Sequence, residues 1–159
     1  MNKRLIIKKI TAALTGELEL YVRAAEYARA EATHEQNKAE HKYDTRGLEA
    51  SYLARGQSRQ AADLEAAIAE FEKLNLRPFA VGEPIGLGAL VELELGGEKS
   101  FYFIGPRAGG TEVVQDRIEI LVITPQSPLG EQLMGKKQGE HPVLAVGGVK
   151  QPAHILRVE

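Results

Sequence analysis

Apolar residues recur every three or four positions through the first half of the chain. Such spacing places side chains on one face of an α-helix, and two separate runs show it. The first run comprises Ile7, Ile10, Leu14, Leu18, Tyr21, Ala25, Ala28 and Ala32, and the second comprises Ala50, Leu53, Gln57, Ala61, Leu64, Ile68 and Phe71. We therefore predict two long helices, each with one apolar stripe that needs a partner.

The segment between the two runs, residues 34–47, is almost wholly polar. Two helices joined by a short turn bury their stripes best when they fold back on each other as an antiparallel coiled-coil hairpin. We place the tip of this hairpin near residues 43–48, and the alanines before it permit a close approach of the two helices. One continuous helix that dimerises is the alternative, which the polar break and Gly47 disfavour.

The second half of the chain alternates short apolar runs with turn residues, a pattern that predicts strands. The expected strands are residues 89–95, 100–104, 117–124, 143–146 and 154–158. Between the third and the fourth, Ser127 suits a helix N-cap, Pro128 suits the first helical turn and Gly135 suits the stop. A short helix thus crosses an antiparallel sheet, which is an α+β arrangement.

Composition changes between the two halves, because all seven prolines lie at or after Pro78. We therefore expect a coiled-coil hairpin over residues 1–77 and a β-rich domain over residues 78–159. The net charge of −2 argues against a broad attraction to nucleic acid. The chain has no cysteine and no apolar stretch near the roughly 20 residues of a membrane helix, so we expect a soluble, cytoplasmic protein.

Residues 124–140, TPQSPLGEQLMGKKQGE, resemble the C-terminal signature of the GreA/GreB family of bacterial transcription factors. In that family a strand leads into a Ser-Pro helix, a Leu-x-Gly-Lys turn and a Gly-acidic pair. Residues 85–91 and 102–106 also resemble the first two strands of the family's C-terminal domain. The resemblance covers nearly the whole chain. It implies an antiparallel α-helical hairpin followed by an FKBP-like antiparallel β-sheet domain with one short helix.

In this family the hairpin enters the secondary channel of RNA polymerase and the FKBP-like domain sits at its rim. Acidic residues at the tip help hold Mg²⁺ at the polymerase active site, which promotes cleavage of backtracked RNA. The resemblance thus implies a transcription elongation factor that is an accessory to RNA polymerase and not an enzyme itself. We expect a monomer that meets nascent RNA only within the complex and binds no Mg²⁺ when free. The expected polymerase contacts are Ser127, Pro128, Leu129, Gly135 and Lys136.

The tip carries the candidate catalytic acids. The family places an Asp and a Glu three positions apart here; Asp44 matches the Asp, but Gly47 stands where the Glu would be. Glu40 and Glu49 are the nearest other acids, so Asp44, Glu49 and Glu40 are the candidates for catalysis, and Asp44 and Glu49 for binding the metal ion. The alternative is that Asp44 or Thr45 only caps the second helix and that Glu40 and Glu49 are solvated charges.

Other polar residues near the tip have less specific interpretations. His34 and His41 share a helix face and could bind a metal ion, although surface roles fit them better. Arg46 and Arg55 could contact RNA phosphate or only balance charge. We expect Tyr52 to pack in the core, with stacking on a base as the alternative.

Three other functions compete with transcript cleavage. A related channel binder could modulate or inhibit RNA polymerase without cleavage, which the glycine at position 47 permits. An FKBP-type peptidyl-prolyl isomerase is a distant alternative. That activity needs an aromatic-lined pocket, and the second half of the chain has only Phe79, Phe101, Tyr102 and Phe103, of which neighbours on a strand face opposite ways. A regulator of nucleoside diphosphate kinase is a further relative, but its hairpin is shorter than the one predicted here.

Overall fold

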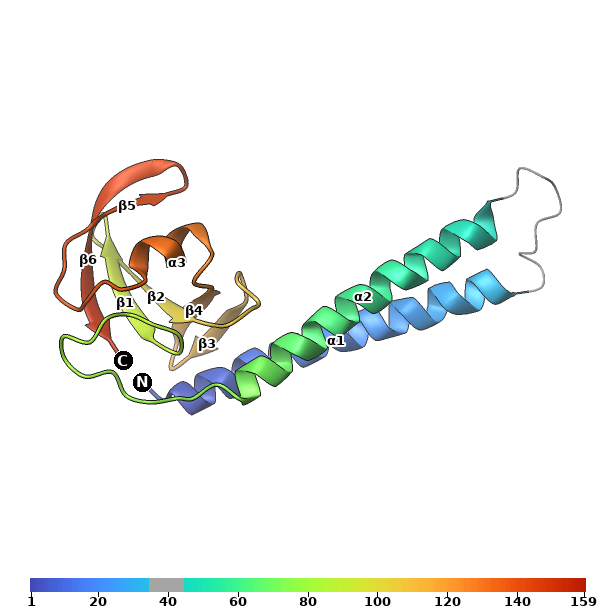
Figure 1. The fold of residues 1–159 in the computed structure, drawn as a ribbon, viewed down its shortest axis with the longest axis horizontal. Coiled ribbons are helices and arrows are strands. Elements are labelled where there is room, and N and C mark those ends of the chain that lie inside the picture. Colours follow the sequence, from blue (N-terminus) through green and yellow to red (C-terminus); the bar gives the residue numbers. More distant parts are fainter. Residues whose placement is uncertain (35–44) are drawn as a thin grey trace. The chain divides into compact units, whose positions relative to one another are not determined.

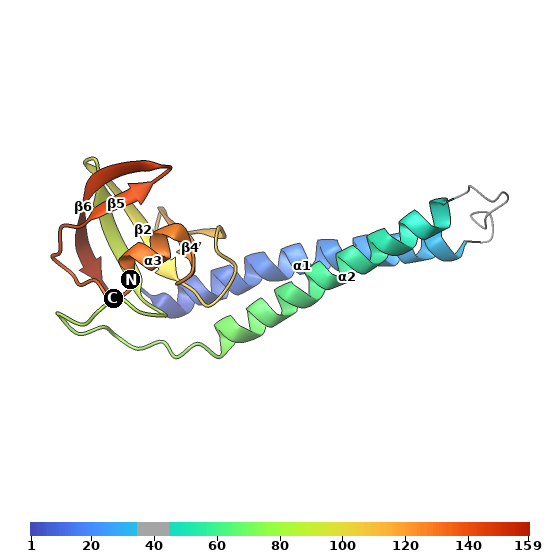
Figure 2. The same ribbon diagram turned by 45° about the horizontal axis from the view of Figure 1, so that its top comes forward.

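The computed structural model describes the chain except for residues 35–44 and the side chain of Arg46. Two long helices are followed by six strands and a short helix, as Figures 1 and 2 show. The helices are α1 (Lys3–Thr33), α2 (Arg46–Glu72) and α3 (Pro128–Leu133). The strands are β1 (Leu90–Leu95), β2 (Glu98–Ile104), β3 (Glu112–Gln115), β4 (Ile118–Ile123), β5 (Val143–Val146) and β6 (Val149–Val158). The predicted fold class is confirmed.

The first two helices form the predicted hairpin. Helix α1 begins after Asn2, whose side-chain oxygen accepts the amides of Arg4 and Leu5 at 3.1 and 3.3 Å. The helices have 31 and 27 residues, or about 45 and 40 Å at 1.5 Å per residue. They lie side by side in both views and run in opposite directions. Their seam buries small side chains toward the far end, namely Ala25 and Ala28 of α1 and Ala54 and Ala61 of α2.

The stripe of α2 differs from its prediction at one place. Leu53 is 55% exposed, whereas its neighbour Ala54 is buried, so the prediction that Leu53 lies in the seam is wrong. The buried residues of α1 along this part of the hairpin include alanines, and helices packed through methyl groups leave too little space for a leucine. The predicted core position of Tyr52 is also wrong, since this side chain is 60% exposed.

The strands form one sheet in the order β3-β4-β2-β1-β6-β5. Among the strand pairs that the structure describes, β2 and β4 run parallel, with Phe101 opposite Ile120 and Ile104 opposite Ile123. The other pairs are antiparallel, as predicted. The sequence prediction missed β3, which lies at the edge of the sheet next to β4. Because β3 runs antiparallel to β4, the chain reverses before β4, and β4 then runs parallel to β2.

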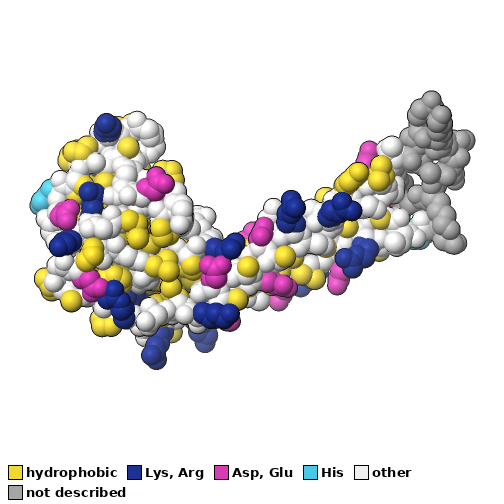
Figure 3. Space-filling view, viewed as in Figure 1, with side chains coloured by type: hydrophobic (Ala, Val, Ile, Leu, Met, Phe, Trp, Pro, Cys, Tyr) yellow, Lys and Arg dark blue, Asp and Glu magenta, His cyan; other side chains and the backbone are white. Residues whose placement is uncertain are grey.

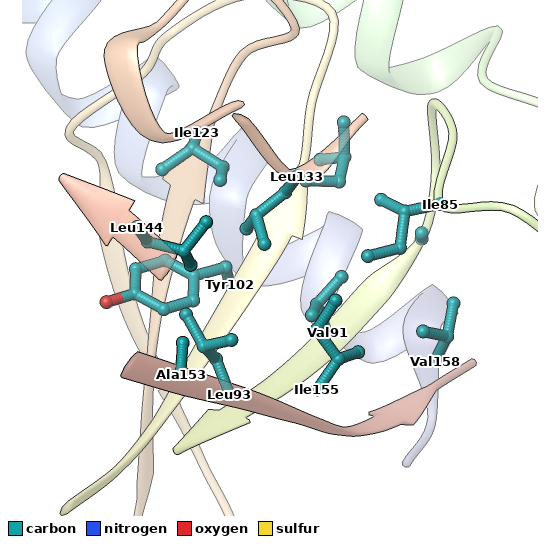
Figure 4. Packing of buried hydrophobic residues seen from close by; sticks show 12 residues of the cluster. Ile85, Val91, Leu93, Tyr102, Ile123, Leu133, Leu144, Ala153, Ile155 and Val158 are labelled. Carbon is teal, nitrogen blue, oxygen red and sulfur yellow. The ribbon is translucent and has the colours of Figure 1, made fainter. Parts of the chain in front are cut away.

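One face of the sheet carries the larger apolar cluster, shown in Figure 4. Helix α3 covers this face, and its Leu133 is fully buried there. The cluster comprises Ile85, Ala89, Val91, Leu93, Tyr102, Ile104, Ile123, Leu133, Leu144, Ala153, Ile155 and Val158. Helix α3 therefore helps to close the apolar core, and the turns before and after it hold it against the sheet.

The opposite face of the sheet holds a second set of buried residues, because adjacent residues of a strand point to opposite faces. Phe103 is fully buried on this face, and its ring centroid lies 6.5 Å from that of Phe71 at the end of α2. Ile6 and Ile10 of α1 are also fully buried. Accordingly, residues 1–13 and 69–159 form one compact unit, and residues 14–68 form the other. We predicted a domain boundary between residues 77 and 78, after which a fragment could fold on its own. That boundary stays a prediction.

Side chains contact the backbone of both outer strands of the sheet. The Lys9 amine of α1 donates to the carbonyl oxygen of Val114 in β3. At the other edge, the side-chain amide of Gln132 bonds the backbone of Ala145 in β5 twice. Its oxygen accepts the Ala145 amide at 2.7 Å, and its nitrogen donates to the Ala145 carbonyl at 3.1 Å.

Two leucine substitutions test the seam. Leu14→Ala removes a side chain that is 2% exposed, so we expect a loss of about 2–5 kcal/mol in the free energy of unfolding. Leu53→Ala removes the same atoms from an exposed position and should change it by less than about 0.5 kcal/mol. Urea denaturation followed by circular dichroism measures both, and equal losses would contradict the observed register.

Candidate functional site

The far end of the hairpin, where α1 ends at Thr33 and α2 begins at Arg46, is the first candidate site. Asp44 and Glu40 lie outside the described residues, so their predicted roles remain predictions. Glu49 is described and occupies the first turn of α2. A carboxylate in this turn is stabilised by the helix dipole, which favours negative charge at the N-terminus.

Glu49 is exposed and is oriented by the residue that precedes the helix. The hydroxyl of Thr45 donates to Glu49 Oε1 at 3.1 Å, and the Glu49 amide donates to the Thr45 carbonyl at 2.8 Å. The second of these bonds is an ordinary backbone bond of the helix, and the first joins the two side chains. The Glu49 carboxylate is therefore held at the start of α2 by its Oε1 atom, and Oε2 is the oxygen that a cation could approach.

A groove of about 410 Å³ lies between the two helices near this end. Arg29 of α1 and Arg55 of α2 line it together with alanines and the hydroxyls of Thr33, Ser51 and Ser58. Sequence reasoning identified Arg55 but missed Arg29, because residues on different helices meet only when the register of the hairpin is known.

Apolar side chains are exposed beside this groove. Leu48, Tyr52 and Leu53 are all exposed on the first two turns of α2, and the Arg55 guanidinium lies 6.0 Å from the centre of the Tyr52 ring. Figure 3 shows hydrophobic and basic side chains next to each other over these turns of α2. An exposed apolar cluster with cations beside it is typical of a contact surface for another macromolecule.

The predicted histidine site has only one described member. His34 is exposed just after α1, and His41 lies outside the described residues. Within residues 1–34 and 45–159, no group of three side chains of the types that bind metal ions comes together. The side chain of Arg46 also lies outside the described part, so its predicted phosphate contact is untested.

The family-like segment of the second domain begins with a capped helix. Ser127 Oγ accepts the amide of Gly130 at 3.1 Å and donates to the carbonyl of Thr124 at 2.8 Å. Pro128 follows at the first helical position, as predicted. A β-carbon at Gly130 would lie 1.8 Å from the Thr124 carbonyl oxygen, so the tight turn requires glycine there. Ser127 thus has the capping role that the sequence predicts.

Backbone hydrogen bonds connect the end of α3 to the loop that precedes β1. Gly135 has a φ of 79°, a left-handed conformation that glycine adopts without strain. Its amide donates to the Ile85 carbonyl at 3.0 Å, and the Ile85 amide donates to the Lys136 carbonyl at 2.7 Å. Pro128 is exposed, and Leu129 and Lys136 are partly exposed, so these predicted partner-binding residues present part of their surface. Their contact with a partner stays a prediction.

A cationic network that sequence reasoning missed surrounds Phe79. The Lys3 amine donates to the carbonyls of Arg77 and Gly88 at 2.5 and 3.1 Å. It also lies 4.9 Å from the centre of the Phe79 ring, and the Arg77 guanidinium lies 4.6 Å from it. Burial lowers the pKa of Lys3 below its ordinary value.

Arg77 in turn forms an ion pair with Glu83. The hydrogen bond from Arg77 lowers the pKa of the Glu83 carboxyl, and the Ala80 amide, which donates to that carboxylate at 2.9 Å, acts in the same direction. These residues are far apart from Lys3 in the sequence, which explains why no local motif indicated the network.

These features define a class of protein: a long helical hairpin followed by a domain with a six-stranded sheet and a short capped helix. In the described part of the chain, no helix is both long enough and apolar enough to cross a membrane.

Comparison with known proteins gives likenesses among solved structures. No family model and no curated protein matches the chain. GreA factor homolog 1 (Gfh1) of Thermus thermophilus is 24% identical, with 94% of each chain covered and a TM-score of 0.40. Gfh1 of Thermus aquaticus is 24% identical over 95% of this chain and 94% of that one, with a TM-score of 0.41. A third structure, described as the transcription factor Gfh1, is 25% identical with the same coverage and a TM-score of 0.40. Of these three names, that of the Thermus thermophilus structure describes a homologue of GreA.

Two glycine substitutions test the turn before α3. Gly130→Ala forces a methyl group onto the Thr124 carbonyl, and we expect it to lower the free energy of unfolding by at least about 2 kcal/mol. Gly56→Ala, on an open surface of α2, should instead raise it by about 0.5–1 kcal/mol, because alanine favours helix. Thermal and urea denaturation measure both. A neutral Gly130→Ala variant would show that the turn is not as tight as described.

Proposed function

We propose that this protein is an RNA polymerase accessory factor of the GreA/GreB type. Its hairpin enters the secondary channel of the polymerase, and acidic residues at the tip promote cleavage of backtracked RNA. The protein would act in the cytoplasm, on the polymerase's own active site. The observation that carries the proposal is the hairpin itself: two long helices with an exposed carboxylate, Glu49, at their far end.

The dimensions of the hairpin suit this role. Each helix is about 40 Å long or more, which is enough to reach from a protein surface into a deep channel. The alanine seam toward the far end, with Ala25, Ala28, Ala54 and Ala61 buried, brings the two helices close together. A thin hairpin of this kind delivers side chains into a narrow space that a globular domain could not enter.

The chemistry of the tip suits Mg²⁺. Carboxylate oxygens are the side-chain ligands that this ion prefers, and an ion beside a phosphodiester polarises the bond and activates a water molecule. In the described part, Glu49 supplies such a carboxylate, and one of its oxygens is oriented by the Thr45 hydroxyl. Asp44, which matches the family's acid, and Glu40 are the further candidates. The polymerase would supply the remaining ligands, so the free protein needs no complete metal site.

The second domain would supply docking at the rim of the channel. The cap at Ser127 and the glycine turn at Gly135 hold α3 and the following segment rigidly against the sheet. Pro128, Leu129 and Lys136 then present their exposed parts on one short stretch of chain. A rigid surface of this kind binds with little loss of conformational entropy.

Binding to the channel without cleavage is the second candidate function. Gly47 stands in the first turn of α2, where the family pattern has its second acid, so one carboxylate of the usual pair is missing. Leu48, Tyr52 and Leu53 are exposed close to this position and could contact the channel wall instead. A factor that fills the channel in this way would inhibit or modulate the polymerase.

Prolyl isomerase activity has less support. Such activity requires aromatic side chains that line one pocket. Tyr102 and Phe103 are both buried and, as neighbours on β2, point to opposite faces of the sheet. They therefore cannot line a common pocket.

Charge-removing substitutions at the tip test the cleavage proposal. Asp44→Asn and Glu49→Gln keep side-chain size but remove the charge that attracts Mg²⁺. We expect RNA cleavage by backtracked polymerase to slow by about tenfold or more, equivalent to about 1.4 kcal/mol of barrier, while polymerase binding survives. Glu65→Gln, an exposed carboxylate in the body of α2, is the matched control and should leave cleavage unchanged.

The unmodified protein decides between the two candidate functions. If it binds core polymerase and never accelerates cleavage at any Mg²⁺ concentration, the cleavage proposal fails and the inhibitory function replaces it. If it accelerates cleavage and the tip variants are as active as the control, the acids have been placed wrongly. Absence of binding to polymerase would reject both functions.

A further inference from the structure

A groove of about 920 Å³ lies on the compact unit formed by residues 1–13 and 69–159. It runs between the start of α1, the segment that leads from α2 to β1, and the strands β1, β2 and β6. We call it the basic groove, because five basic residues and only two acidic residues line it. The basic residues are Lys3, Arg4, Arg77, Lys99 and Arg157.

The positive charge of the groove contrasts with the chain as a whole, which has a net charge of −2. Three of the five basic residues form ion pairs: Lys99 with Glu92 at 3.2 Å, Arg157 with Glu159 at 2.5 Å, and Arg77 with Glu83 outside the groove. The excess positive charge of the groove therefore comes from Lys3 and Arg4. Arg4 has no ion-pair partner among the residues that the structure describes. The basic groove therefore attracts an anionic ligand.

Apolar surface lies beside these charges. Val81 is 94% exposed, and Leu156 and Val158 of β6 also line the groove. An exposed valine at the mouth of a charged groove offers an apolar partner a surface to cover. A ligand that fits the groove would thus combine negative charge with an aliphatic or aromatic group.

The Phe79 ring does not favour a nucleotide as that ligand. Lys3 and Arg77 both lie against the ring, 4.9 and 4.6 Å from its centre. The cations that would neutralise phosphate therefore already cover the aromatic surface on which a base would stack. The apolar surface that remains available is aliphatic, which suits a peptide side chain better than a base.

The walls of the groove are held in place before any ligand binds. Lys3 ties α1 to the backbone of Arg77 and Gly88, and Arg77 pairs with Glu83, which also accepts the Ala80 amide. The segment between α2 and β1 is thus fixed by contacts that it makes with its own residues and with α1. A preformed site of this kind binds a peptide with less loss of entropy than a mobile loop would.

We propose that the basic groove docks an acidic peptide segment of a partner protein, with carboxylates beside Arg4 and one apolar side chain against Val81. The volume lies within the range of known ligand sites, and the charge and apolar surface are complementary to such a segment. This interaction lies beyond the proposed function and does not depend on it, because none of the tip acids takes part.

A peptide array tests this proposal on the full-length protein. The probes are labelled peptides of about twelve residues that are rich in Asp and Glu and carry one Leu or Phe, whose place in the peptide is varied across the array. The matched control peptides either lack the apolar residue or carry Lys in place of the acidic residues. We expect the acidic, apolar-anchored set to bind, and more weakly as salt rises from about 0.05 to 0.5 M. The dissociation constants of the best binders are then measured by fluorescence anisotropy.

Single substitutions place the binding in the groove. Arg4→Glu and Val81→Asp, both at exposed positions, should each weaken binding by about fivefold to tenfold. Lys150→Glu makes the same charge change at an exposed position outside the groove and should have less than about a twofold effect. Circular dichroism confirms that each variant is folded.

Three results would overturn the proposal. One is that no acidic, apolar-anchored peptide binds more tightly than the basic set. Another is that Arg4→Glu and Lys150→Glu weaken binding equally, which would indicate nonspecific charge attraction. The third is that inorganic triphosphate or a nucleoside triphosphate displaces the peptides at lower concentration than they bind, which would make the groove a phosphate site. Because polymerase is absent from these measurements, their failure would leave the proposed function unaffected.

Discussion

The contact between Phe71 and Phe103 is the constraint on which the rest of the first compact unit depends. It joins the end of α2 to the centre of the sheet, with the two ring centroids 6.5 Å apart. Gly105 makes this approach possible, since a β-carbon there would lie 2.8 Å from the Phe71 ring. The ends of the hairpin are therefore built into the sheet domain, and both helices start or finish on a rigid base.

The sequence predicted those features that depend on local patterns. The two apolar stripes, the hairpin and the capped helix at Ser127 follow from periodicity and from residues with strong positional preferences. The seam at Leu53 and the strand β3 could not be predicted in the same way. Whether Leu53 or Ala54 enters the seam depends on how closely the partner helix approaches, and β3 is a short edge strand whose pairing with β4 is decided by tertiary contacts.

The candidate sites divide along the same line. Glu49 could be identified from its place beside the polar break, because a chain reversal brings nearby residues to one end. Arg29 and Arg55 line one groove, and Lys3 donates to the backbone carbonyl of Arg77, although the residues of each set come from distant parts of the chain. No spacing in the sequence indicates either proximity, because each depends on how the helices and strands pack together.

The bonds that Lys9 and Gln132 make to the outer strands occupy backbone groups at both edges of the sheet. A strand of a second chain could extend the sheet only by pairing with the free backbone groups of β3 or β5. The Val114 carbonyl is already occupied at one edge, and both backbone groups of Ala145 are occupied at the other. An added strand would have to displace these side-chain bonds, so the open sheet opposes strand addition at both edges without closing into a barrel.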